Sequence, residues 1–143
     1  MDLNEAVEAL GLIAALCALG ALSNLLLKEI SRTFIKNLPR KYAEFASAYR
    51  SFMRFMVRRH RYFGLASFFF VLVHAFTAIA GSALSVTGLI GAAALTGTVC
   101  LGIYGFYIEK SLRSAWLQVH RTFAFILLVA VTVHFFFRIP VTL

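Results

Sequence analysis

The longest stretch without a charged side chain runs from Tyr62 to Ile108 and contains 47 residues with no Asp, Glu, Lys or Arg. A helix that crosses the hydrocarbon core of a bilayer needs about 20 consecutive apolar residues. The stretch therefore has the length of two membrane spans, with Gly81 and Ser82 as the turn between them. Only 14% of the whole chain is charged, against about 25% in a typical soluble protein. The sequence therefore predicts an integral membrane protein.

Four apolar segments are predicted to be transmembrane helices, at about residues 8–27, 62–81, 86–108 and 115–137. The connections between them are too short for a second domain. Residues 1–143 are therefore expected to form one all-α domain, a four-helix transmembrane bundle. The first segment is taken as a span rather than a signal peptide, because signal peptides begin with basic residues and this chain begins with Asp2, Glu5 and Glu8.

A polar segment separates the first two spans, and Pro39 bars a continuous helix through it. From about residue 40 to residue 59, aromatic residues recur every three or four positions with basic residues between them. This pattern predicts an amphipathic helix at the cytoplasmic membrane surface. Such a helix could anchor the chain to lipid or dock another protein, and it could also continue directly into the second span.

The basic residues are distributed unequally between the two ends of the predicted bundle. Lys and Arg in short loops stay on the cytoplasmic side. Ten of the 14 basic residues lie between Lys28 and Arg61. Three more follow the third span: Lys110, Arg113 and Arg121. Only Arg138 falls at the opposite end. This distribution predicts that both termini are outside, in a plasma or inner membrane, and that the second and fourth spans are parallel. Because topology explains the net charge of +8, no nucleic-acid partner is expected.

All four histidines of the chain lie within the predicted spans or beside their ends, and they form two pairs with the same spacing. His60 and His74 are fourteen residues apart, and so are His120 and His134. Fourteen helical residues return to within about 40° of the starting direction and rise about 21 Å. Each helix therefore presents two imidazoles on one face. Because the two helices are predicted to be parallel, His60 should face His120 and His74 should face His134.

Two facing imidazoles are better suited to haem than to zinc. Zinc in proteins usually takes four ligands in a tetrahedron, whereas the haem ring supplies four nitrogens and needs only axial ligands from the protein. The sequence has no Cys-x-x-Cys-His motif for covalent haem attachment. We therefore expect two haem b groups, an inner one on His60 and His120 and an outer one on His74 and His134.

Residues beside the inner pair are candidates for further contacts with haem. Gly64 would leave room for the ring next to His60. Arg61 and Arg121 could pair with haem propionates, although the preference for basic residues at the cytoplasmic side also explains their presence. Four residues on the same faces would fill the space between the two levels: Ser67, Val71, Leu127 and Val131.

Two motifs of the chain resemble a known family. The first motif is His60-Arg61-x-x-Gly64 with His74, and the second is Trp116-x-x-x-His120-Arg121 with His134. Together they are similar to the ferric-reductase-like transmembrane domain of the cytochrome b superfamily, which also forms the haem core of NADPH oxidases. The resemblance covers about residues 20–140. It implies electron transfer across the bilayer through two b haems held by the histidine pairs given above. Members of that family usually have six helices, and the reductases also carry a flavin and nicotinamide domain, for which this chain has no motif.

These features together predict an electron-transfer subunit of a larger, hetero-oligomeric membrane oxidoreductase. Its redox partner is expected to be a flavin or iron–sulfur protein, or a quinone at the membrane surface. No catalytic residue is predicted, because no Ser, Cys or carboxylate arrangement typical of acid–base or nucleophilic catalysis is present. The alternative is a non-redox membrane protein, either an assembly anchor or a transporter whose histidines relay protons or bind a metal.

Overall fold

The computed structural model describes residues 2–81, 84–109, 111, 115–137 and 139. Four α-helices account for most of them: α1 (Leu3–Thr33), α2 (Ala43–Ala80), α3 (Val86–Tyr107) and α4 (Ala115–Phe136). Each helix is long and apolar enough to cross a membrane. The structure thus agrees with the predicted all-α class and the four predicted helices. Four residues used above to predict a turn and the topology lie outside the described residues: Ser82, Lys110, Arg113 and Arg138.

The first helix is longer than its apolar segment because polar residues stabilise its start. The Asp2 side chain accepts a hydrogen bond from the Glu5 backbone N–H at 2.8 Å, and the Glu5 carboxylate accepts one from the Asp2 N–H at 3.1 Å. This capping box satisfies two backbone donors that the first helical turn leaves without intrahelical partners. The helix therefore begins at Leu3, several residues before the predicted span.

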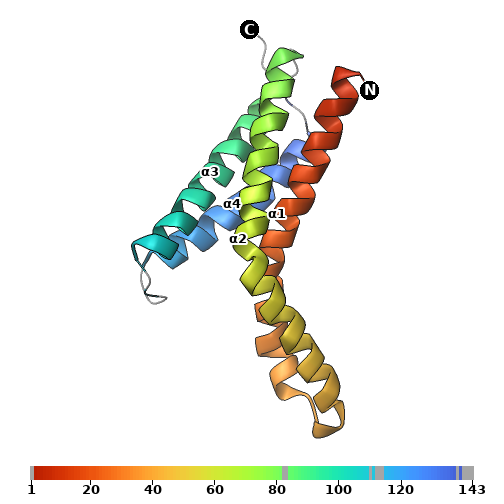
Figure 1. Ribbon diagram of the computed structural model, residues 1–143, viewed down its shortest axis with the longest axis vertical. Helices are drawn as coiled ribbons and strands as arrows, with labels where there is room; N and C mark the ends of the chain where they lie inside the picture. Colours follow the sequence, from red (N-terminus) through yellow and green to blue (C-terminus); the bar gives the residue numbers. More distant parts are fainter. Residues whose placement is uncertain (1, 82–83, 110, 112–114, 138, 140–143) are drawn as a thin grey trace.

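The segment from residue 40 to residue 59 does not form a separate surface helix, and from Ala43 it continues directly into the second span, the other possibility given above. Two short 3-10 helices, η1 (Ile35–Asn37) and η2 (Arg40–Tyr42), lie on either side of Pro39, and α2 then runs unbroken from Ala43 to Ala80. The basic segment is therefore the first half of a long helix. It packs against the end of α1 and projects beyond α3 and α4 along the bundle (Figure 1). The sequence contains no Pro or Gly between residues 43 and 61 that would separate it from the second span.

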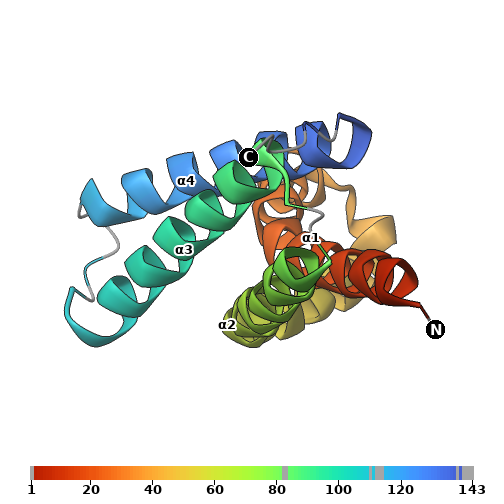
Figure 2. The same cartoon turned by 90° about the horizontal axis from the view of Figure 1, so that it is seen from above.

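The helices form two antiparallel pairs, α1 with α2 and α3 with α4 (Figures 1 and 2). α2 and α4 run in the same direction, as predicted, and α1 begins at the end of the bundle where α4 finishes (Figure 1). Within these fully described helices, no α-carbon of α2 comes within 8 Å of an α-carbon of α4. The two histidine-bearing helices thus face each other across a wider gap than the helices within each pair.

The core lies between the two histidine levels. Ala94, Leu95 and Leu127 are buried, and the side chains packed against them include Val71 and Val131, as predicted for the space between the levels. Ser67 differs from that prediction. It is 1% exposed, and its hydroxyl donates a hydrogen bond to the Ala14 carbonyl of α1 at 3.0 Å, because a buried hydroxyl needs a partner.

Two glycines allow α3 and α4 to approach closely. A Cβ at Gly97 would overlap the ring of Phe123, and a Cβ at Gly105 would overlap the indole of Trp116. Small residues at such contacts are common where helices associate in membranes, because they let the backbones come together.

We expect Gly97→Ala to destabilise the bundle, although alanine is the better helix former. The added methyl group must displace the Phe123 ring, and overpacking of this kind typically costs about 1–3 kcal/mol. The measurement is the free energy of unfolding in a detergent titration. Thr96→Ala, at an exposed position of the same turn, is the control and should be close to neutral. Equal stability of the two variants would contradict the close contact between Gly97 and Phe123.

Candidate functional site

The four histidines form two pairs across the gap between α2 and α4. The ring centroids of His60 and His120 are 6.2 Å apart, with an angle of 81° between the ring planes. Those of His74 and His134 are 6.3 Å apart, with an angle of 77°. All four side chains are half-buried. The structure thus brings together the same partners that the fourteen-residue spacing predicted.

Three of the imidazoles are held by backbone carbonyls of the adjacent helix. His60 Nδ1 lies 2.9 Å from the Ala21 oxygen and His74 Nδ1 lies 2.8 Å from the Val7 oxygen, both on α1. His120 Nδ1 lies 3.0 Å from the Thr98 oxygen on α3. A carbonyl can only accept, so each Nδ1 carries the proton. Nε2 is then the ring nitrogen that could coordinate a metal, and the carbonyl fixes both the tautomer and the ring orientation.

His134 is held by side chains instead. Its Nδ1 lies 3.3 Å from Ser85 Oγ and 3.1 Å from Thr87 Oγ1. The Thr87 hydroxyl donates its own proton to the Phe137 carbonyl at 3.2 Å, and Ser85 Oγ accepts from the Gly88 N–H at 3.1 Å. Because the Thr87 proton is used in this way, Nδ1 of His134 is the donor to Thr87. The fourth imidazole therefore also carries its proton on Nδ1.

Glycines on α1 and α3 allow these close approaches. A Cβ at Gly11 would lie 3.0 Å from the His74 ring, and one at Gly88 would lie 3.1 Å from the His134 ring. At Gly102 the corresponding distance to the His120 ring is 3.5 Å. Larger residues at the first two positions would push the imidazole away from its hydrogen-bond acceptor.

The distance within each pair can be compared with that of two imidazoles on one metal ion. A bond from an imidazole nitrogen to a metal is about 2.0 Å long, and the nitrogen is about 1.1 Å from the centre of its ring, so two opposed ligands have centroids about 6.2 Å apart. The observed separations are 6.2 and 6.3 Å. Two glycines of α2 and α3 also have open space where a side chain would begin. A Cβ at Gly64 or at Gly91 would meet no heavy atom within 4 Å, although Gly91 is buried. The ring separations therefore suit two axial ligands on one metal ion, such as a haem iron.

The two predicted propionate partners occupy different surroundings. The Arg61 guanidinium lies over the rings of Tyr62 and Phe106, at 4.8 and 5.1 Å from their centroids, and donates a hydrogen bond to the Tyr62 hydroxyl at 2.8 Å. Arg121 is exposed and follows His120 directly. Both are near the level of the inner pair, and their pairing with propionates stays a prediction. Trp116 packs edge-on against His120, with ring centroids 6.2 Å apart.

The partners that hold the imidazoles were not predicted from the sequence. Val7, Ala21 and Thr98 contribute only their carbonyls, which every residue type possesses, so no side chain marks these positions. Ser85 and Thr87 precede His134 by 49 and 47 residues, and nothing local in the sequence connects them to it.

Among the described residues, no group of three or more His, Cys, Asp or Glu side chains could hold a metal ion together. Each histidine pair thus offers two protein ligands. Comparison with known proteins adds no relative, since no family model, curated protein or solved structure matches this chain.

Proposed function

We propose that this chain is an integral membrane cytochrome that binds two b-type haems and transfers electrons across the bilayer. The observation that carries the proposal is the presence of two histidine pairs across the gap between α2 and α4, with centroid separations of 6.2 and 6.3 Å. The pairs are fourteen residues apart on both α2 and α4. Two ligands at this separation, with no third among the described residues, suit a cofactor that brings its own equatorial nitrogens.

Haem supplies an iron that accepts and returns one electron, and the protein sets how readily it does so through ligands, hydrogen bonds and burial. His60 and His120 would hold the inner haem, and His74 and His134 the outer one. The Nδ1 hydrogen bonds keep each ring in the tautomer that can bind iron through Nε2. The buried residues between the levels, Ala94, Leu95 and Leu127, keep water out of the space that separates the two sites.

The proposed orientation places His60 and His120 on the cytoplasmic side, because the basic residues gather at that end of the helices. Both termini are then outside, in a plasma or inner membrane. The two sites are about 21 Å apart along the helices, so together they extend over most of the hydrocarbon core, which is about 30 Å thick. Electrons would enter or leave at the inner end through a flavin or iron–sulfur subunit, or through a quinone.

Haem content tests this proposal directly. The chain expressed with sufficient haem should be red, and acid acetone should extract about two protohaems per chain, as expected for non-covalent axial ligation. A variant with both Cys17 and Cys100 replaced by alanine is the control and should keep the same content, since thiols take no part. A colourless protein, a ratio near one, or haem that stays on the polypeptide would refute the two-haem proposal. The first of these results would favour the non-redox alternative.

A further inference from the structure

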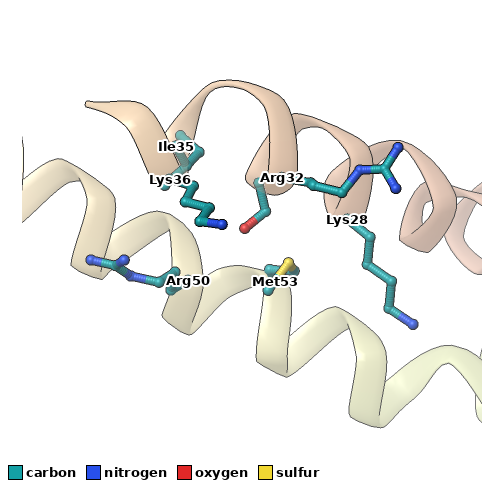
Figure 3. A pocket seen from close by; sticks show the side chains of 7 residues that line it. Lys28, Arg32, Ile35, Lys36, Arg50 and Met53 are labelled. Carbon is teal, nitrogen blue, oxygen red and sulfur yellow. The ribbon is translucent and has the colours of Figure 1, made fainter.

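A basic groove lies where the end of α1 packs against the first half of α2. Its volume is about 330 Å³. Four cationic side chains line it: Lys28, Arg32, Lys36 and Arg50. Figure 3 shows them coming from both walls, with Lys36 extending into the space between the two ribbons. Among the described residues, no Asp or Glu lines the groove.

Most of this positive charge is not neutralised within the protein. Arg32 pairs with Glu29 at 3.0 Å, in a surface contact where both side chains are more than half exposed. Within the described part of the chain, the side chains of Lys28, Lys36 and Arg50 make no ion pair or hydrogen bond. Like charges around one groove repel each other, so an anion that binds there would gain attraction to several of them at once.

The floor of the groove is less polar than its rim. Ile35 is 6% exposed, and Ser31 and Met53 are half-buried while the four cations are exposed. An inorganic anion would gain nothing from the Ile35 and Met53 side chains. A molecule with an anionic head and an apolar body would contact both the rim and the floor.

The position of the groove along the helices also indicates a lipid. Lys28 is the first charged residue after the long apolar run of α1, which ends at Leu27. In a membrane-inserted chain this is the level of the phospholipid headgroups, where basic pockets between helices bind anionic lipids. We infer that this groove binds the phosphate headgroup of an anionic phospholipid. The inference rests on the membrane insertion in the proposed function, but it does not depend on haem.

Binding can be measured on the full chain in neutral detergent by native mass spectrometry. The probe is dioleoylphosphatidylglycerol, and dioleoylphosphatidylcholine, with the same acyl chains and no net charge, is the matched lipid. We expect phosphatidylglycerol binding to saturate at about one tightly bound lipid per chain, ahead of phosphatidylcholine. Millimolar inorganic phosphate should not displace it. If phosphate displaced the lipid, the groove would be a site for free anions. Equal binding of the two lipids would mean that the groove does not recognise headgroup charge, and either result would overturn the inference.

Two variants with the same change in net charge test the location. Lys28→Gln with Arg50→Gln removes one cation from each wall of the groove, whereas Arg54→Gln with Arg58→Gln removes two exposed cations of α2 that do not line it. We expect about a 30-fold loss of phosphatidylglycerol affinity in the first variant, the factor expected for two basic residues at a membrane surface. The second variant should bind nearly as the original chain does. Equal losses would mean general surface attraction and would overturn the groove as the site.

Haem content measured in the same samples separates this inference from the proposed function. Two haems per chain without selective binding of phosphatidylglycerol would refute the lipid site in the groove and leave the proposed cytochrome function standing. Selective lipid binding by a haem-free chain would refute the cytochrome and leave the lipid site standing.

Discussion

Replacing either His60 or His120 with alanine should remove the inner haem, and replacing both should remove little more. The two imidazoles face each other with ring centroids 6.2 Å apart, so each would supply one axial ligand to the same iron. Ligands that act on one iron are coupled, and coupled residues give non-additive effects. Each single variant and the double variant should therefore retain about one haem per chain, half of the two expected for the original chain.

The outer pair should behave in the same way, and combinations across the two levels should not. His74→Ala and His134→Ala should each leave about one haem, whereas His60→Ala with His74→Ala should leave almost none, because it affects two irons. The measurements are haem per chain and the reduced absorption spectrum for four single and six double variants. Phe76→Ala, at an exposed position two residues beyond His74, is the control and should keep both haems.

Two results would contradict this arrangement. One is close to full haem content with an unchanged spectrum in all four single variants, which would mean that the histidines are not ligands. The other is non-additivity between His60 and His134, which would assign the ligands to different pairs. Either result would also remove the basis for a transmembrane electron path.

The helices could be predicted from the sequence largely because hydropathy and helical periodicity are local properties. The predicted start at residue 86 coincides with that of α3, and the predicted ends at residues 108 and 137 lie one residue beyond those of α3 and α4. The errors lie where polar residues extend a helix beyond its apolar part. α1 reaches from Leu3 to Thr33, well outside its apolar segment. Hydropathy registers neither the capping box at its start nor the polar residues that continue the helix beyond Leu27. The basic segment joins α2 because charged side chains do not break a helix that contacts water.

Which histidines lie opposite each other could be predicted, because this depends only on the helical repeat and on the parallel direction of α2 and α4. The partners of Nδ1 could not, because they depend on how α1 and α3 are placed beside α2 and α4. His60 reaches Ala21 across 39 residues of sequence, and His74 reaches Val7 across 67. Such contacts follow from tertiary register, which a single sequence does not display. The same applies to the basic groove, since its two walls come from segments that only the folded chain brings together.

The hydroxyl groups of Ser85 and Thr87 hold His134. Three of the histidines donate to backbone carbonyls, which no side-chain substitution removes. His134 instead contacts Ser85 Oγ and Thr87 Oγ1. The outer site is therefore the one where side-chain substitutions can remove the partners that orient a ligand. Loss of such partners typically lowers metal affinity about 10- to 100-fold.

We expect Ser85→Gly with Thr87→Val to weaken the outer haem by about that factor, 10- to 100-fold. Valine nearly matches the shape of threonine without its hydroxyl. Glycine removes the Ser85 hydroxyl at the N-cap of α3 with a capping loss of only a few tenths of a kcal/mol. The measurement is the rate at which the protein loses haem to an excess of a tightly binding acceptor protein. A His60→Ala background leaves the outer haem alone, so that the rate reports one site.

The matched control is Thr98→Val, in the same helix and beside the inner pair. The Thr98 hydroxyl bonds to the Ala94 carbonyl at 2.8 Å, while its backbone carbonyl holds His120 at 3.0 Å. Valine keeps that carbonyl, so the inner haem should be released no faster than from the original chain, as measured in a His74→Ala background. Faster release of haem from Thr98→Val, or unchanged release from the double variant at the outer site, would contradict the role assigned to these hydrogen bonds.

If only the double variant releases haem faster, His134 is the least firmly oriented of the four ligands, because hydroxyl groups hold it where backbone carbonyls hold the other three. The outer haem would then be the more easily exchanged of the two, because ligand orientation by hydrogen bonds is part of metal affinity.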